Sequence, residues 1–236
     1  MKIGIMQPYM FPYIGYWQLI SAVDEFVLLD DVNYIMRGFI NRNSILVNQK
    51  PYTFSIPIKK ASQNKLIMET QLNFSEREKE KFLKRIELAY KKAPYFSEAM
   101  PVLENIICNS QIDLTDYVLY QILSICKYLG ISLNIKKSSE IKKDNSLHAQ
   151  ERIIEICKKM EADTYINPSG GRKLYDSERF TQEGIKLKFL DVDFNSIEYK
   201  QFEHQYIPNL SIIDIMMFNS VDEIKKILKK FDLKEK

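Results

Sequence analysis

The sequence has few of the residues that most often form catalytic or metal centres. Among its 236 residues there are three cysteines and two histidines. Cys108, Cys126 and Cys157 are far apart and each falls in an apolar helical pattern, which indicates reduced core thiols rather than disulfides or a metal site. The motifs G-x-S-x-G and H-E-x-x-H and a Cys–His pattern are absent, which disfavours a serine or cysteine hydrolase and a zinc enzyme.

Long hydrophobic runs and a strong charge imbalance are absent as well. No segment approaches the roughly 20 apolar residues of a membrane span, and the start MKIGIMQPYM has no apolar stretch typical of a signal peptide. The net charge is only +3, and the lysines are spread along the chain rather than interleaved with aromatic residues. We therefore expect a cytoplasmic protein that has no membrane span and binds no nucleic acid.

The residues that are present are typical of one folded domain. Hydrophobic residues make up 45% and charged residues 28%, and 236 residues suffice for a substantial core. The chain shows no internal repeat and no low-complexity linker. We predict a single α/β domain over residues 1–236.

The N-terminal stretch predicts the type of sheet. Residues 3–6 form an apolar run typical of a buried strand, and Pro8 ends it because proline cannot donate to a strand ladder. A helical pattern begins at Tyr16, and residues 25–29 form a second apolar run. This order is the opening unit of an open, mostly parallel, Rossmann-like sheet, in which ligands bind beyond the carboxyl ends of the strands.

Three consecutive helical patterns interrupt this alternation between residues 75 and 130. The first begins at Ser75, which forms a capping box with Glu78, and the last ends at Gly130. The predicted helix starts are Ser75, Ser97, and Asp113 or Thr115. We predict a helical subdomain, residues 75–130, inserted in the α/β domain.

Strand and helix patterns fill the remaining chain. The predicted strands are residues 44–47, 52–58, 67–73, 131–135, 162–166 and 186–190. The predicted helices start at Ser146, Tyr175, Ser211 and Ser220, and a charged tail ends the chain.

Asp30 and Asp31 follow the second predicted strand and are the candidate catalytic residues. One of them can act as a general base toward an amine or hydroxyl acceptor. Alternatively, the pair can hold Mg²⁺ beside substrate phosphates, which requires only one or two carboxylates. A third interpretation is that both are ordinary turn residues at a strand end. The sequence predicts no dedicated metal site and identifies no cofactor.

Loops around these aspartates carry candidate substrate-binding groups. Arginine and asparagine recognise carboxylates and phosphates, and a Ser-Gly-Gly turn lets the backbone approach a ligand closely. The alternatives are a hairpin whose polar groups satisfy its own backbone and, for Arg152, a surface pair with Glu151 or Glu155. The candidates are Gln7, Pro8, Tyr9, Tyr13, Tyr16, Arg37, Asn41, Arg42, Asn43, Arg152, Ser169, Gly170, Gly171 and Arg172.

Seven segments resemble blocks of the WbqC-like family of bacterial proteins and together span nearly the whole chain. They are MQPYMFPYIGYWQLI, DEFVLLDDVNY, RGFINRN, YKKAPYF, ERIIEIC, YINPSGGRKLYD and PNLSIIDIMMFN. Members of that family are encoded among O-antigen and other surface-polysaccharide genes, and transfer of an amino acid such as glycine to a sugar has been suggested for them. The resemblance implies a biosynthetic context more firmly than a reaction.

The opening also resembles that of nucleotidylyl transferases, which carry H-x-G-H at the head of the first helix. The corresponding residues here are Tyr13-Ile14-Gly15-Tyr16, and tyrosine does not become a cation near neutral pH. This difference disfavours nucleotidyl transfer by that route. A neutral site of this kind would instead hold a nucleotide-sugar or an acyl-adenylate.

We therefore expect a transferase that modifies a sugar for surface polysaccharide, by amino-acid (glycine-type) or acyl transfer to a nucleotide-linked sugar. The competing hypothesis is a non-catalytic nucleotide- or sugar-binding partner of a biosynthetic enzyme. A homo-oligomer is compatible with either. The enzyme hypothesis expects Asp30, Arg42 and Arg172 to meet in one crevice.

Overall fold

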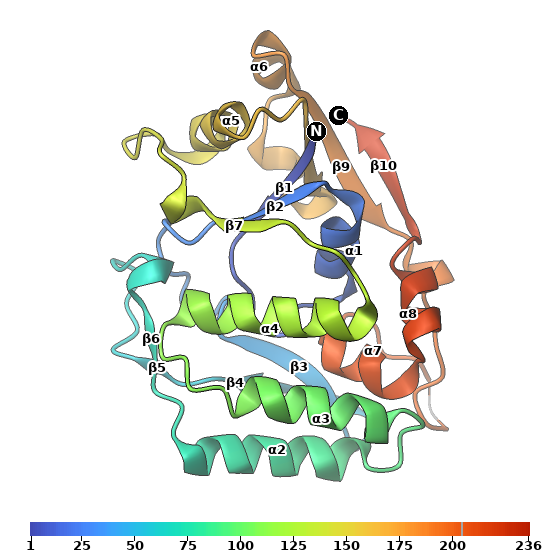
Figure 1. The fold of residues 1–236 in the computed structure, drawn as a ribbon. Coiled ribbons are helices and arrows are strands. Elements are labelled where there is room, and N and C mark those ends of the chain that lie inside the picture. The colour runs from blue at the N-terminus through green and yellow to red at the C-terminus, as the bar shows by residue number, and fades with distance from the viewer. Residues whose placement is uncertain (204) are drawn as a thin grey trace.

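The computed structural model describes residues 1–203 and 205–236 and shows an α/β fold around a six-stranded, mostly parallel sheet (Figure 1). The spatial order of the strands is β10-β9-β8-β1-β2-β7. Their bounds are β1 (Lys2–Met6), β2 (Glu25–Leu28), β7 (Ile135–Lys137), β8 (Thr164–Pro168), β9 (Lys186–Val192) and β10 (Phe231–Glu235). The predicted α/β class with a mostly parallel sheet is confirmed.

The first strand lies in the interior of the sheet. β1 pairs in parallel with β2 on one side and with β8 on the other. The chain adds β2 and β7 outward from β1, then returns to add β8 and β9 on the opposite side. All five parallel strands therefore end at the same edge of the sheet, and the direction of strand addition reverses between β1 and β8.

Helices cover both faces of this sheet because successive strand residues point to opposite sides. Ile3, Ile5 and Val27 pack against one set of helices, whereas Phe26 and Leu28 belong to the core on the other face. The first face carries α5 (Ala149–Lys159) and α6 (Ser177–Gln182), and the second carries α1 (Ile14–Ala22). Figure 1 shows α5 and α6 separated from α1 by the strands.

A larger layer of helices packs beyond α1. It contains α2 (Glu76–Tyr90), α3 (Phe96–Ile107), α4 (Leu114–Leu129), α7 (Ile212–Phe218) and α8 (Val221–Ile227). Two short antiparallel pairs adjoin it: β3 (Arg42–Val47) with β4 (Lys50–Ser55), and β5 (Ile58–Lys59) with β6 (Gln71–Leu72). That residues 75–130 are an inserted subdomain stays a prediction, because these helices share one hydrophobic core with α1.

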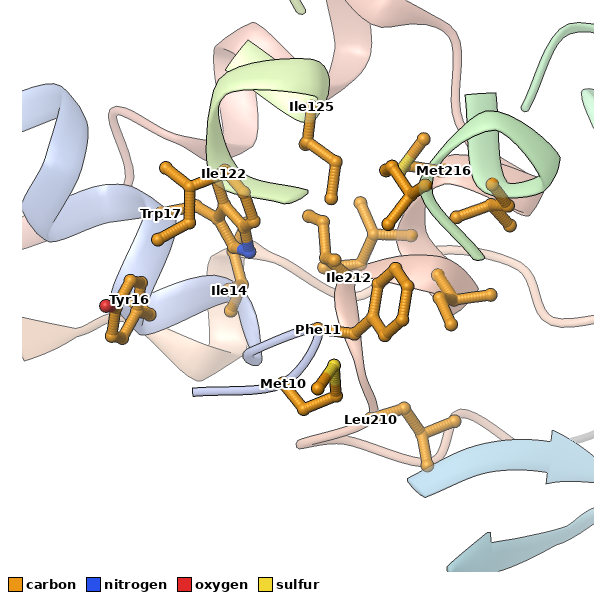
Figure 2. Packing of buried hydrophobic residues seen from close by; sticks show 14 of the residues in the cluster. Met10, Phe11, Ile14, Tyr16, Trp17, Ile122, Ile125, Leu210, Ile212 and Met216 are labelled. Atoms are coloured by element: carbon orange, nitrogen blue, oxygen red, sulfur yellow. The ribbon is translucent and has the colours of Figure 1, made fainter. Parts of the chain in front are cut away.

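The loop between β1 and α1 lies at the centre of this core. Figure 2 shows Met10 and Phe11 among residues of α1, α4 and α7. Both side chains are fully buried. The amide of Gln121 on α4 fixes the loop: its Oε1 accepts from Phe11 N at 2.9 Å and its Nε2 donates to Tyr9 O at 3.3 Å. The Gln121 amide therefore fixes the backbone of the loop that follows β1.

A second buried polar group links the helical layer to its neighbours. Asp214 on α7 is fully buried and accepts hydrogen bonds from Tyr90 Oη at 2.8 Å, Tyr199 Oη at 2.6 Å and Gln201 Nε2 at 2.7 Å. Burial raises the pKa of Asp214 despite these three donors. We refer to these four residues as the Asp214 cluster.

Several predicted boundaries are wrong for local reasons. α3 begins at Phe96 after Tyr95, so Ser97 lies inside the helix rather than at its cap. α5 begins at Ala149 rather than at Ser146, because Ser146 is held in a turn by two hydrogen bonds to Asp144 Oδ1.

Three segments differ from the predicted strands. Residues 131–134 are irregular and β7 begins only at Ile135. Residues 67–73 form the 3₁₀ helix η1 (Ile67–Glu69) and the short β6 instead of one strand. The charged tail contains β10, which pairs antiparallel with β9. Four of the five residues of β10 are exposed and three are charged, so its sequence resembles a tail.

Among the described residues, no helix is both long and apolar enough to cross a membrane. Of the cysteines, Cys126 and Cys157 are buried as predicted, and burial raises the pKa of each thiol to about 12. Cys108 is exposed, which corrects its assignment to the core, because it follows the last turn of α3.

Candidate functional site

A cavity of about 690 Å³ opens at the carboxyl ends of β2 and β7. Both polar and apolar side chains line this cavity. The polar lining is Asp31, Asn33, Ser139, Asn145, His148, Gln150 and Arg152. The apolar lining is Leu29, Val32, Leu66, Met68, Ala149, Ile153, Leu174 and Tyr175.

Asp31 forms a buried ion cluster at the edge of this cavity. Its Oδ2 lies 2.5 Å from Lys143 Nζ, and its Oδ1 lies 3.7 Å from Arg152 Nη1. The Lys143 side chain is only 1% exposed and also donates to the carbonyl of Ser138. Lys143 therefore occupies the space beside Asp31 that a bound cation would need, so this carboxylate does not fit a Mg²⁺ site.

The charges around Asp31 determine its protonation. Burial alone would raise the pKa of Asp31, but hydrogen bonds from Lys143 and Ser138 and the charges of Lys143 and Arg152 outweigh it. The net effect lowers the pKa of Asp31. The carboxylate is therefore ionised at neutral pH and already compensated by protein cations.

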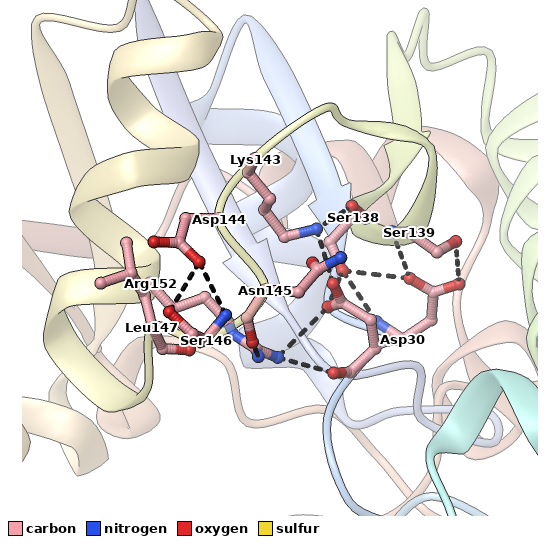
Figure 3. Close-up of polar contacts among 10 residues, drawn as sticks. Asp30, Ser138, Ser139, Lys143, Asp144, Asn145, Ser146, Leu147 and Arg152 are labelled. Atoms are coloured by element: carbon pink, nitrogen blue, oxygen red, sulfur yellow. Dashed lines mark hydrogen bonds and ion pairs between the residues drawn. The ribbon is translucent and has the colours of Figure 1, made fainter.

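Asp30 accepts hydrogen bonds from two serines that follow β7 (Figure 3). Ser138 Oγ lies 3.0 Å from Asp30 Oδ1 and 2.5 Å from Asp31 Oδ1, so one hydroxyl joins both carboxylates. Ser139 donates from its backbone N to Asp30 Oδ1 at 2.9 Å and from its Oγ to Asp30 Oδ2 at 2.7 Å. Asp30 is only 1% exposed, whereas Ser139 and Asp31 line the cavity.

Arg152 fixes the loop that precedes α5. Its guanidinium donates to three backbone carbonyls: Asp31 O at 2.6 Å, Leu147 O at 2.8 Å and Asn145 O at 2.9 Å. Figure 3 shows this side chain between the loop and the end of β2. Most of its donors are therefore engaged within the protein. We call Asp30, Asp31, Ser138, Ser139, Lys143 and Arg152 the edge cluster.

Three lining side chains remain available to a ligand. Asn33, Asn145 and His148 are exposed in the cavity, and their side chains make no hydrogen bond to another described residue. His148 also precedes α5, whose first turn receives no side-chain cap. The free N–H groups of such a helix end favour an anionic group.

The candidates in the loop after β1 lie in a different environment. Tyr16 is buried and its Oη donates to Gln7 O at 3.1 Å, so its hydroxyl serves the backbone. The Tyr9 ring packs 5.8 Å from that of Tyr16, and Tyr13 lies over Gly15, where an added Cβ would be 2.6 Å from Tyr13 Oη. Pro8 is buried as well, and Gln7, Tyr9 and Tyr13 are half-buried.

The candidates in residues 37–43 mainly satisfy backbone groups. Asn43 donates to Phe11 O at 2.8 Å and to Met10 O at 3.2 Å, and Asn41 Nδ2 donates to Ile56 O at 2.8 Å. Arg42 Nε donates to Gly38 O at 3.1 Å. Arg37 is exposed and has φ of 60°.

The Ser169–Arg172 candidates form a 3₁₀ helix, η3 (Ser169–Leu174), after β8. Arg172 pairs with Asp191 at 3.3 Å, and its guanidinium lies 5.1 Å from the centre of the Phe189 ring. Gly171 packs so closely on Asn167 that an added Cβ would lie 2.1 Å from Asn167 Nδ2, whereas Gly170 faces open space.

The structure thus brings Asp31 and Arg152 together at one cavity, but this cavity is not lined by Arg42 or Arg172. Sequence reasoning did not propose Ser139, Lys143, Asn145 and His148 as site residues. The available signal was the polar run after the predicted strand 131–135, because loops at carboxyl ends of strands carry sites. Within the described residues, no group of three or more His, Cys, Asp and Glu side chains could hold a metal ion.

These features define an α/β protein whose polar cluster and cavity lie at the carboxyl ends of parallel strands. The sequence model of the WbqC-like protein family matches residues 7–226, and the chain belongs to this family. A protein of Mycobacterium tuberculosis described as uncharacterized protein Rv1507c is 29% identical over 217 residues, which cover 91% of this chain and 92% of that protein. No solved structure matches the chain significantly.

Proposed function

We propose that the protein is a cytoplasmic transferase that modifies a nucleotide-linked sugar for bacterial surface polysaccharide, by amino-acid or acyl transfer. The ligand binds in the cavity bounded by the edge cluster. Membership in the WbqC-like family supports the biosynthetic context, which the resemblance of the sequence implies. The observation that carries the proposal is the position of the cavity.

The topology supports this position. The parallel strands run β9-β8-β1-β2-β7, with the direction of addition reversing between β1 and β8, as in Rossmann-like sheets. Ligands of such sheets lie beyond the carboxyl ends of the strands, which is where this cavity opens. Its volume of about 690 Å³ is in the range of small-molecule sites.

The lining supports a ligand with an anionic part and an apolar part. The start of α5 attracts a phosphate or carboxylate, while Asn33 and Asn145 offer paired donors and acceptors to a sugar. The apolar part of the lining, which includes Met68, Leu174 and Tyr175, suits a nucleobase or an acyl group. Arg37, Arg42 and Arg172 would contribute only to a ligand that extends beyond this cavity.

The chemical step we propose is deprotonation of the acceptor through Ser139. The acceptor amine or hydroxyl gives its proton to Ser139 Oγ as it attacks the donor's carbonyl carbon, and Ser139 gives its own proton to Asp30 Oδ2, 2.7 Å away. The donor's leaving group departs when the tetrahedral intermediate collapses. Asp30 is the base in this scheme, and Asp31 holds Lys143 and Ser138 in place.

A non-catalytic binding protein is the second candidate. The observation that favours it is the engagement of Lys143 and Arg152, both of which direct their donors to Asp31 and to backbone carbonyls. Charged side chains with this many internal contacts position a loop rather than stabilise a transition state. This alternative predicts ligand binding without turnover.

A thermal-shift screen followed by two variants separates the candidates. Nucleotide-sugars, ATP with amino acids, and acyl-coenzyme A are tested as ligand classes, and saturable stabilisation by one class identifies the donor or acceptor. A ligand at 100 times its Kd stabilises by about 2.7 kcal/mol. Asp30→Asn and Ser139→Ala should then lower turnover at least about 100-fold with little change in Kd.

The matched control for the second variant is Ser132→Ala, an exposed serine in the irregular segment before β7. It should leave turnover unchanged. Binding without turnover in the wild type supports the binding protein instead. Stabilisation by none of the three classes contradicts both candidates.

A further inference from the structure

A patch of apolar side chains is exposed on the loop between β2 and β3. Ile35, Met36 and Phe39 are 50%, 47% and 58% exposed, although such side chains are usually covered. The loop itself is anchored, because Tyr34 N donates to Lys65 O at 2.9 Å. The apolar tip is therefore presented to solvent by an ordered loop.

Several cations lie on this loop and on the segment that pairs with its start. Residues 32–65 contain six lysines and arginines but no aspartate or glutamate, in a chain whose total net charge is +3. Five of the six lie on the same loop, at the start of β3, or on residues 59–65, a segment whose last residue accepts the hydrogen bond from Tyr34. They are Arg37, Arg42, Lys59, Lys60 and Lys65. None of the five forms an ion pair with any residue that the structure describes.

The acidic residues that flank this stretch of the sequence are already engaged. Asp31, at the start of the loop, is buried and compensated by Lys143 and Arg152. Glu69, which follows the basic segment, accepts a hydrogen bond from Leu66 N at 2.9 Å. The patch therefore combines a positive potential with exposed hydrocarbon, and Figure 1 shows β5 and β6 at the side of the molecule opposite α8.

We propose that this patch docks the protein on an anionic membrane surface. The cations attract the lipid headgroups, and Ile35, Met36 and Phe39 enter the boundary between headgroups and acyl chains. A nucleic acid would use the cations but leave the aliphatic side chains in water. The proposal requires no particular reaction, and so it stands apart from the transferase assignment.

Docking through this patch would place the cavity near the membrane. Both segments of the patch continue directly into the lining of the cavity. The shared lining residues are Val32, Asn33, Leu66 and Met68. Docking through the patch therefore brings the cavity's edge to the level of the lipid headgroups.

The test is cosedimentation of the full chain with vesicles of phosphatidylcholine alone and of phosphatidylcholine mixed with phosphatidylglycerol. We expect binding to the mixed vesicles that weakens with added salt, and little binding to the neutral ones. Replacing Lys59, Lys60 and Lys65 together by glutamine should lower the partition coefficient about 100-fold. Phe39→Ser should lower it on the order of 10-fold.

Matched controls change the same chemistry elsewhere. Leu88→Ser alters a side chain that is 62% exposed on α2, and replacement of Lys91, Lys92 and Lys127 by glutamine removes three exposed lysines. Both controls should bind as the wild type does. The proposal fails if the wild type ignores anionic vesicles or if the patch variants bind them normally. It fails too if these variants abolish RNA binding or self-association while vesicle binding persists.

Discussion

The edge cluster and the Asp214 cluster solve the same physical problem in opposite ways. Each holds a buried carboxylate, but Asp31 is compensated by Lys143 and Arg152, whereas the partners of Asp214 among residues 1–203 and 205–236 are the hydroxyls of two tyrosines and one amide. The pKa of Asp31 is accordingly lowered, and burial raises that of Asp214. Cations accompany the carboxylate beside a cavity, and neutral donors accompany the one in the core.

The location of each cluster explains this difference. Charges are less costly at the border of the cavity, where water and ligand approach, than between packed helices. Neutral donors fix α7 against α2 and against Tyr199 without burying a second charge. We infer from this comparison that the Asp214 cluster stabilises the packing of the helices. The edge cluster instead places charged groups beside the cavity, where they can interact with a bound ligand.

The largest expected effect is that of Asp214→Ala. Removal of the carboxylate takes the acceptor from two tyrosine hydroxyls and one amide and leaves a small cavity, so the free energy of unfolding should fall by about 4 kcal/mol. Urea denaturation followed by circular dichroism measures this change. Asp232→Ala, on exposed β10, is the control and should change stability by less than about 0.5 kcal/mol. Equal losses of stability in the two variants would show that the hydrogen bonds of the Asp214 cluster do not stabilise the fold.

Arg152→Met should cost about 3 kcal/mol, because it leaves Asp31 with one cation fewer and three backbone carbonyls without their donor. The same denaturation experiment applies. Arg179→Met is the control: Arg179 pairs with Glu151 and Glu183 in solvent-screened bridges, so its loss should cost much less than that of Arg152. A loss for Arg152→Met no greater than the control's would remove the proposed role of Arg152 in fixing the loop before α5.

Acidification should affect the two clusters in opposite directions. Because the folded pKa of Asp31 is lowered, its contribution to stability is present above the ordinary value of 3.8 and is lost as the pH falls below it. Because the folded pKa of Asp214 is raised, its contribution is fully present below 3.8 and is lost as the pH rises through the raised folded value.

Unfolding curves across this pH range for the wild type, Asp31→Asn and Asp214→Asn measure these contributions. Asp31→Asn should reduce the acid loss, and Asp214→Asn should remove the gain on acidification from neutral pH. The slope of unfolding free energy against pH should differ between each variant and the wild type by an amount that corresponds to the uptake of at most about one proton. Parallel curves for all three proteins would contradict the contrast between the clusters.

The smallest effect concerns packing after β8, next to the cavity. Gly171→Ala forces Asn167 to move and should cost about 1 kcal/mol, because the added methyl group overlaps a buried amide. Gly170→Ala points into open space and should be neutral within about 0.5 kcal/mol. Thermal unfolding of the two variants measures their difference in stability. A larger loss for Gly170→Ala than for Gly171→Ala would show that the residues around Gly171 rearrange without cost.

Local signals were enough to predict much of the fold. The run 3–6, the capping box at Ser75 and the stop at Gly130 are each decided by neighbouring residues, and the structure has a strand or a helix end at each. Residues 131–134 alternate apolar and polar residues and were therefore predicted as a strand, but they are irregular, whereas β10 was missed because its charged, exposed residues resemble a tail. The family prediction is confirmed by the match over residues 7–226.

The candidate site could be predicted only in outline. The strand-end aspartates were identifiable because they follow an apolar run, but their partners are distant: Ser138 is 108 residues from Asp30, and Arg152 is 121 residues from Asp31. No local pattern pairs such residues. The sequence therefore indicates which groups are unusual, while only the folded chain decides whether Arg152 faces a ligand or its own backbone. The assignments of catalytic and binding residues stay predictions.

The pairing of β10 with β9 makes the charged end of the chain a structural element. Its five residues cover the backbone of β9 beside buried Phe189 and Leu190. Truncating this dispensable-looking tail would leave an uncovered strand edge, the kind of surface through which sheets of separate molecules join into aggregates. Expression variants should therefore keep the sequence through Glu235.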